Sequence, residues 1–304
     1  MISLSCKKEQ PAEPTPPPVV AGWGAQKSGT ARNLNSVYFC DANTGYAVGD
    51  AGTLLKTTNG GTTWTILASG TTALINDVFF LDVNTGYFVG SGGTFSKTTD
   101  GGANWTSLAT GTPGMLSSVY FANVNTGFAI GDTILKTTNG GISWTRQASG
   151  SFFDAYFLNA STGFAVGYPG LILKTTNGGT DWITCSSGTN AALFDVFFVD
   201  ANTGYVSAGY TSTDGKMLKT TNGGSSWTTQ MSVTNASLWG IHFVNANTGY
   251  VVGFPGTILK TTNGGTTWVA QTSGTNVHLH RAHFPNASSG YAVGNEGTIL
   301  KYIE

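Results

Sequence analysis

The stretch Thr57-Thr58-Asn59-Gly60-Gly61-Thr62-Thr63-Trp64 decides the fold, because the chain repeats it. The pattern Thr-Thr-Asn/Asp-Gly-Gly-x-x-Trp occurs six times, and its tryptophans, 38 to 45 residues apart, are Trp64, Trp105, Trp144, Trp182, Trp227 and Trp268. A second marker, Thr/Ser-Gly followed by Tyr or Phe, occurs seven times, with its glycines at Gly45, Gly86, Gly127, Gly163, Gly204, Gly249 and Gly290. Such a period is typical of repeat architectures. The chain therefore consists of seven units, one of which lacks its tryptophan box.

One unit contains four short segments with strand character. In the first unit these are residues 34–40, 46–48, 53–57 and 64–67, which are rich in β-branched, aromatic and aliphatic side chains. The turn Asn59-Gly60-Gly61 supplies the positive φ angles that a tight hairpin needs. Four strands in about 40 residues are the signature of a propeller blade. We therefore predict an all-β, seven-bladed propeller built from four-stranded antiparallel blades.

The last unit ends at Glu304, one strand short of a blade. Residues 23–30 match residues 268–275, which follow the last box, and so they read as an orphan fourth strand. We predict that this N-terminal strand closes the last blade, because closure removes an open sheet edge. The propeller domain should span residues 19–304.

The first 18 residues form a separate segment. Ser3-Leu4-Ser5-Cys6 resembles the end of a bacterial lipoprotein signal peptide, in which the cysteine becomes lipidated, and the proline-rich residues 11–18 suit a semi-rigid tether. The alternative is a disordered terminus with a chance cysteine. The lipoprotein interpretation predicts an exported protein of the cell envelope, in the periplasm or at the cell surface. Its contact with the membrane would be a lipid on Cys6.

Composition excludes two other classes of protein. The net charge is -1 and the chain has only three arginines (Arg32, Arg146 and Arg281), so no basic surface for nucleic acid is expected. No run of eighteen apolar residues occurs, so no membrane-spanning helix is predicted. Cys40 and Cys185 are expected to be unpaired thiols.

The box Thr57-x-Asn59-x-Gly61-x-Thr63-Trp64 resembles the Asp-box, or BNR repeat, and Asp100 keeps the aspartate of that motif. The longer pattern, from Gly45-Tyr46-Ala47-Val48-Gly49 to Trp64, resembles the photosystem II assembly and stability factor family over roughly residues 20–304. The resemblance implies a propeller fold and a scaffold role. Related propellers also include sialidases and xyloglucan-type glycoside hydrolases, so fold alone does not decide function.

Differences among the repeats indicate a binding face. The box turns and the Asn-Thr-Gly turns are nearly constant and lie on one face of a propeller, so they read as structural. The opposite face varies. It carries aromatic residues of blades four to six, at Phe153, Tyr168, Phe194, Tyr210, Trp239 and Phe254, together with Asp77, Asp154, Asp195, His280 and Arg281. These side chains suit a sugar or the apolar side chains of a peptide. The alternative is that Phe153, Phe194 and Trp239 pack between blades near the inner channel.

Two further patterns receive structural interpretations. His278 and His280 share a strand face, but a third ligand is not evident, so we predict no metal and no cofactor. His283 aligns with Tyr38, Phe79, Tyr120 and His242 in an interior aromatic column. Each repeat also has one lysine before its box, and we expect a solvated amine with a packed aliphatic stem.

A binding module explains these features better than an enzyme. A sialidase needs three convergent arginines, and the three present lie in unrelated positions of the repeat. A glycosidase with two aspartates, drawn from Asp77, Asp154 and Asp195, stays open as the alternative. We predict a monomeric, non-enzymatic scaffold that recognises an envelope protein or a glycan on its variable face.

Overall fold

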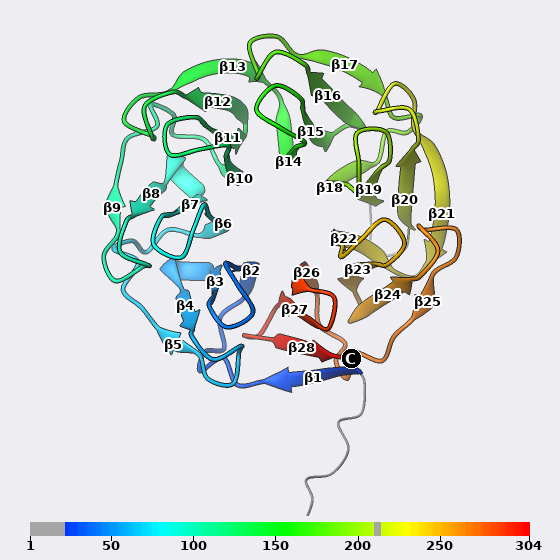
Figure 1. Ribbon diagram of the computed structural model, residues 1–304, viewed down its shortest axis with the longest axis horizontal. Helices are drawn as coiled ribbons and strands as arrows, with labels where there is room; N and C mark the ends of the chain where they lie inside the picture. The colour runs from blue at the N-terminus through cyan, green and yellow to red at the C-terminus, as the bar shows by residue number, and fades with distance from the viewer. Residues whose placement is uncertain (1–21, 210–213) are drawn as a thin grey trace, which may run out of the picture.

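Each repeat of the chain folds into one antiparallel sheet of four strands. The computed structural model describes residues 22–209 and 214–304. In this part of the chain seven such sheets stand radially around a common axis, with the first strand of each repeat nearest the axis (Figure 1). The predicted seven-bladed propeller is confirmed.

The first three blades share one plan, and the first two of them carry a 3-10 turn after their second strand. Blade one consists of β2 (Leu34–Phe39), β3 (Gly45–Gly49), η1 (Asp50–Gly52), β4 (Leu54–Thr57) and β5 (Thr65–Ile66). Blade two consists of β6 (Ile75–Phe80), β7 (Gly86–Gly90), η2 (Ser91–Gly93), β8 (Phe95–Thr98) and β9 (Thr106–Ser107). Blade three consists of β10 (Leu116–Phe121), β11 (Gly127–Gly131), β12 (Thr133–Thr137) and β13 (Thr145–Ser149).

Blades four to six have longer inner strands. Blade four consists of β14 (Ser151–Phe157), β15 (Gly163–Tyr168), β16 (Leu171–Thr175) and β17 (Ile183–Ser186). Blade five consists of β18 (Ala192–Phe198), β19 (Gly204–Gly209), β20 (Asp214–Thr220) and β21 (Thr228–Thr234). Blade six consists of β22 (Ser237–Phe243), β23 (Gly249–Phe254), β24 (Thr257–Thr261) and β25 (Val269–Ala270).

The seventh blade joins the two ends of the propeller. Its strands β26 (Leu279–Asn286), β27 (Ser289–Gly294) and β28 (Ile299–Ile303) come from the last repeat, and β1 (Gly22–Gln26) supplies the fourth (Figure 1). β1 pairs antiparallel with β28, from Gly22 opposite Ile303 to Gln26 opposite Ile299. The Trp23 indole packs edge-on against the ring of Phe284. The predicted closure by the N-terminal strand is confirmed.

The seven glycines before an aromatic residue are explained by packing between blades. A Cβ atom on Gly45 would lie 2.5 Å from the ring of Phe39, so only glycine leaves room for that ring. The other face of Phe39 stacks on Tyr291 of blade seven, with ring centroids 3.7 Å apart. The same sandwich of glycine, phenylalanine and an aromatic ring of the preceding blade recurs at all seven interfaces. The repeated glycine before Tyr or Phe is therefore explained by the packing between neighbouring blades.

The tryptophan box is a hydrogen-bonded turn. The Thr57 hydroxyl donates to Asn59 Oδ1 at 3.0 Å and accepts from the amide of Gly61 at 2.9 Å. Asn59 Oδ1 also accepts from the amide of Thr63 at 2.9 Å. Gly60 and Gly61 have φ angles of +63° and +78°, which favour glycine. The box thus stabilises the hairpin between the third and fourth strands.

The repeated lysines correct one of the sequence interpretations. At five of the seven positions the amine donates a hydrogen bond to the neighbouring blade instead of being free in solvent; Lys56 Nζ, for example, donates to the carbonyl of Gly101 at 2.6 Å, and Lys301 Nζ donates to that of Gly60 at 2.7 Å. Each of the seven amines also lies over an aromatic ring, as Lys56 does over Tyr46 at 5.4 Å. The lysines therefore fasten one blade to the next.

Two sequence expectations about the chain as a whole can be compared with the structure. Cys40 and Cys185 are free thiols, as expected. Within residues 22–209 and 214–304 no helix has the length and apolar character needed to cross a bilayer. The lipidation expected at Cys6 and the tether at 1–18 lie outside the described residues.

Candidate binding site at the channel mouth

The variable column of the sequence coincides with a β-bulge. Where each innermost strand begins, its pairing with the second strand skips one residue; in β2, Leu34 pairs with Gly49 and Ser36 pairs with Val48. The same shift occurs in all seven blades, and the skipped residues are Asn35, Asn76, Ser117, Phe153, Phe194, Trp239 and His280. A bulged residue is released from the ladder and its side chain is re-aimed. This column can therefore vary without loss of pairing.

Three bulged residues form a row of stacked rings, which we call the aromatic shelf: Phe153, Phe194 and Trp239. Phe194 and Trp239 are almost parallel, at 4° and 4.5 Å between centroids, and Phe153 lies 5.6 Å from Phe194. All three side chains are half-buried. The rings therefore pack across blades, as the second alternative expected, and they also line an open surface.

The shelf continues onto blade seven. Trp239 contacts His280 edge-on at 5.3 Å, and it contacts His278 in the same way at 5.9 Å. His278 in turn stacks on Phe254 at 4.1 Å. The structure therefore brings four of the predicted residues into one row, namely Phe153, Phe194, Trp239 and His280, with Phe254 at its end.

The opposite half of the mouth is polar. The side-chain amides of Asn35 and Asn76 donate to the carbonyls of Ile75 and Leu116 in the following blades, at 2.9 and 2.7 Å. Together with Ser117 and the shelf they line a depression of about 320 Å³, which we call the mouth depression. An apolar wall facing fixed amides and a hydroxyl suits a ligand that has both apolar and hydrogen-bonding groups.

Two predicted aromatic residues stand apart from this row. Tyr168 keeps 39% of its surface exposed and borders a separate hollow with Asp214 and Lys216. Tyr210 lies outside the described residues.

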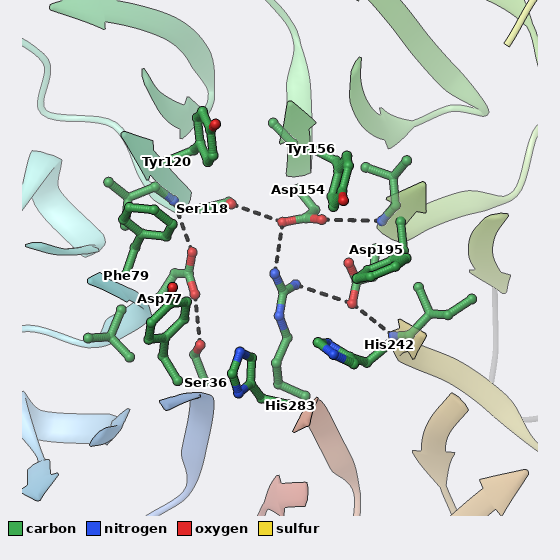
Figure 2. A pocket seen from close by; sticks show the side chains of 18 of the residues that line it. Ser36, Asp77, Phe79, Ser118, Tyr120, Asp154, Tyr156, Asp195, His242 and His283 are labelled. Atoms are coloured by element: carbon green, nitrogen blue, oxygen red, sulfur yellow. Dashed lines mark hydrogen bonds and ion pairs between the residues drawn. The ribbon is translucent and has the colours of Figure 1, made fainter. Parts of the chain in front are cut away.

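The three predicted aspartates occupy the channel wall below the mouth and are buried (Figure 2). Asp77 accepts from the Ser36 hydroxyl at 2.7 Å and from the amide of Val119 at 3.0 Å. Asp154 likewise accepts from the Ser118 hydroxyl at 2.9 Å. Each carboxylate therefore bridges blades. Asp77 also borders the mouth depression, whereas Asp154 and Asp195 line only the channel beneath it, where their oxygens serve contacts between inner strands.

Arg281 reaches across the channel from blade seven. Its guanidinium lies 3.2 Å from Asp154 Oδ1 and 3.3 Å from Asp195 Oδ2, and 29% of its side chain stays accessible. Burial alone lowers the pKa of Arg281, but these carboxylates outweigh it and hold the pKa above its usual range, so the group is charged. Burial also raises the pKa of Asp77 and, more strongly, of Asp195, although Arg281 opposes both shifts. Arg32 and Arg146 are exposed elsewhere, so the three arginines do not converge.

Deeper in the channel, one aromatic or imidazole ring from each blade surrounds a cavity of about 250 Å³, which we call the chamber; the rings belong to Tyr38, Phe79, Tyr120, Tyr156, Phe197, His242 and His283. Part of this ring is labelled in Figure 2. Burial lowers the pKa of His242 to about 4 and that of His283 well below its usual value, so both are neutral. The interior position expected for His283 is confirmed. The sequence predicted this interior aromatic column but did not predict the cavity that it surrounds.

Comparisons with known proteins agree with the repeat pattern. A family profile described as "Photosynthesis system II assembly factor YCF48" matches residues 62–148, 104–188, 180–277 and 236–303. The comparison with curated proteins gives no match.

Solved structures match the fold at low sequence identity. "YCF48 bound to D1 peptide" has a TM-score of 0.78 and 21% identity, over 94% of this chain and 98% of that one. YCF48 from Cyanidioschyzon merolae has a TM-score of 0.78 and 20% identity, over 93% and 99%. The GH74 enzyme of Niastella koreensis has a TM-score of 0.74 and 17% identity, over 91% of this chain and 53% of that one.

Proposed function

This chain belongs to the photosynthesis system II assembly factor YCF48 family, and from that premise we propose that it is a non-enzymatic binding protein that recognises a protein partner at its channel mouth. The contact surface would be the aromatic shelf with the polar half of the mouth depression. The ligand would be a segment of the partner that presents an apolar side chain to the shelf.

The observation that carries this proposal is the shelf itself. Phe153, Phe194 and Trp239 come from three different blades, and all three sit at bulged positions where no ladder contact requires an aromatic ring. Scattered exposed apolar residues need no explanation, whereas a contiguous row beside polar groups is typical of an interaction site. Aromatic side chains of this kind contribute most of the affinity at protein interfaces.

A related solved structure supports a peptide-like ligand. One member of the family was solved with a D1 peptide bound, and it matches this chain over nearly its whole length. We propose that this chain also binds a peptide segment of a protein. We do not propose which protein it binds, because the two sequences are only 21% identical.

The geometry disfavours the glycosidase alternative. The carboxylates of Asp154 and Asp195 share the guanidinium of Arg281 at 3.2 and 3.3 Å. A glycosidic bond would have to lie between two carboxylates that are about 5 Å or more apart. Here Arg281 occupies that position.

We also propose that the protein is exported and anchored through a lipid on Cys6. The support is the sequence Ser3-Leu4-Ser5-Cys6 followed by the proline-rich residues 11–18. Expression of the full gene product in a bacterial host, with and without Cys6→Ala, tests this. The wild type should label with a radioactive fatty acid and sediment with membranes, and the variant should do neither.

The binding proposal is tested with residues 19–304 cross-linked to proteins of an envelope extract. A partner is identified by mass spectrometry, and its affinity is then measured by calorimetry for the wild type, Trp239→Ala and Phe194→Ala. Each variant should weaken binding by about 2 kcal/mol, or about thirtyfold. Ile142→Ala is the control, because Ile142 is 73% exposed on an outer turn away from the mouth.

Three results would contradict the proposal. Equal affinity of both shelf variants and the wild type would remove the shelf from the site. Selective binding on a glycan array, without any protein partner, would mean that the ligand class is wrong. Polysaccharide hydrolysis that disappears in Asp154→Asn or Asp195→Asn would make the protein an enzyme.

A further inference from the structure

The chamber lies beneath the mouth depression and borders it, since Ser36, Asp77 and Arg281 line both. Its seven rings follow one another around the axis, and the neighbouring centroids that contact each other lie 4.8 to 5.4 Å apart, from Tyr38 and Phe79 at 5.4 Å to His283 and Tyr38 at 4.8 Å. Five of the seven rings are phenyl or phenol rings. These contacts join six of the seven neighbouring pairs, and the rings present π-electron density and few formal charges to whatever lies inside.

The wall of the chamber holds more carboxylates than cations. Asp77, Asp154 and Asp195 all border it, whereas Arg281 is its only lysine or arginine within the described residues. Arg281 pairs directly with Asp154 and Asp195 and acts on Asp77 only at longer range; among the described residues Asp77 accepts its hydrogen bonds from the neutral donors Ser36 and Val119. The two histidines contribute no positive charge because they are neutral.

These two features favour the same kind of guest. Aromatic faces attract cations, most strongly where water is excluded. A buried carboxylate without a cation in direct contact is unfavourable, and a cation beside Asp77 would offset that cost. An anion would instead meet an arginine that already has two carboxylate partners. The volume of about 250 Å³ admits one small group and excludes a folded chain.

We propose that the chamber binds an organic cation, an ammonium or guanidinium group enclosed by the seven rings and facing Asp77. This site does not rest on the proposed function, because Phe153, Phe194 and Trp239 line the mouth depression and not the chamber. The group could belong to a free small molecule or to a lysine or arginine side chain of a protein, since both present the same chemistry.

Calorimetry on residues 19–304 tests the proposal with choline and with its neutral isostere 3,3-dimethyl-1-butanol. Choline should bind about tenfold or more tightly, because the two differ only in charge. Nα-acetyl-arginine amide and Nα-acetyl-lysine amide represent protein side chains. If they bind more tightly than choline, the natural guest is a partner's side chain; the reverse order identifies a free small molecule.

A matched pair of variants locates the site. Phe197→Leu keeps an apolar side chain in the chamber but removes a π face, and it should weaken choline binding about fivefold. Phe194→Leu makes the same change three residues earlier in β18, at the mouth, and should leave choline binding unchanged. Asp77→Asn should weaken choline binding about tenfold. If Asp77→Asn does not fold, Phe197→Leu still decides the matter.

The proposal fails if none of the cations binds at concentrations up to about 10 mM. It also fails if choline and its neutral isostere bind equally, or if Phe194→Leu and Phe197→Leu have equal effects. None of these results bears on the protein partner at the mouth, whose binding is measured separately with Trp239→Ala.

Discussion

Alanine in place of Gly127 should destabilise the propeller through one blade interface. Gly127 does not have a positive φ, so alanine is conformationally acceptable there. Its Cβ, however, would lie 2.6 Å from the ring of Phe121, and a comfortable carbon contact needs about 3.5 Å. The ring would have to move by about 1 Å.

The Phe121 ring has no free space into which it could move. Phe121 stacks on Tyr87 of the preceding blade with centroids 3.6 Å apart and an angle of 3°, and both residues are almost completely buried. Overpacking a well-filled core costs about 1–3 kcal/mol, and a ring confined on both faces should lie at the upper end. We therefore expect Gly127→Ala to lower the free energy of unfolding by about 3 kcal/mol.

Urea unfolding of the wild type and four variants (Gly127→Ala, Gly24→Ala, Phe121→Leu and the double variant) tests this reasoning. Gly24→Ala is the control, because a Cβ there has no neighbour within 4 Å and the φ is not positive; it should change stability by less than about 0.5 kcal/mol. Phe121→Leu frees space beside Gly127, so the double variant Phe121→Leu/Gly127→Ala should be more stable than additivity predicts, by about 1–2 kcal/mol. An additive double variant, or a Gly127→Ala protein as stable as the wild type, would refute the proposed packing.

Three further outcomes are expected. Removal of residues 1–29 should expose β28 as an open edge and cause aggregation or a large loss of stability, whereas removal of 1–18 should be harmless; equal melting temperatures would contradict the closure. Trp227→Ala should cost about 3–5 kcal/mol in urea unfolding without a selective effect on ligand binding, because the indole is buried within its blade. Burial lowers the pKa of His242 to about 4, so its neutral form stabilises the fold above pH 6.5 and that stability is lost as the pH falls toward 4. Relative to His242→Phe, the wild type should lose about 3 kcal/mol between pH 7 and pH 4, and parallel pH profiles of the two proteins would exclude this contribution.

The fold could be predicted because its determinants recur seven times. A single Gly-Tyr pair is weak evidence, but seven pairs at one period leave no other architecture for strands of this length. The closing strand could also be predicted, since Trp23 repeats the pattern that follows Trp268. The reason for the glycine before each aromatic residue could not be predicted. It depends on the stacking of Phe39 on Tyr291, and these two residues belong to opposite ends of the chain.

The candidate site could be predicted only in part, and depth along the channel explains the difference. Phe194 and Asp195 are adjacent in sequence, and the repeat pattern places both on the variable face. The bulge at Phe194 turns its side chain to the mouth, while Asp195 accepts from the amide of Ile241 in the next blade at 2.8 Å. Sequence columns distinguish constant from variable positions, but a one-residue bulge that separates surface from wall is visible only in the pairing of strands.

The division between scaffold and site follows from that same bulge. In a regular ladder every residue of an innermost strand is constrained, either by pairing or by packing against the next blade. The bulge releases one residue per blade from the pairing, and it does so at the mouth of the channel, where these seven residues lie. In blades one and two that residue is an asparagine that bonds its neighbour, and in blades four to six it is an aromatic ring. A closed ring of near-identical blades thereby acquires an asymmetric mouth, and one ligand can be bound in one orientation without any change to the repeats that hold the ring together.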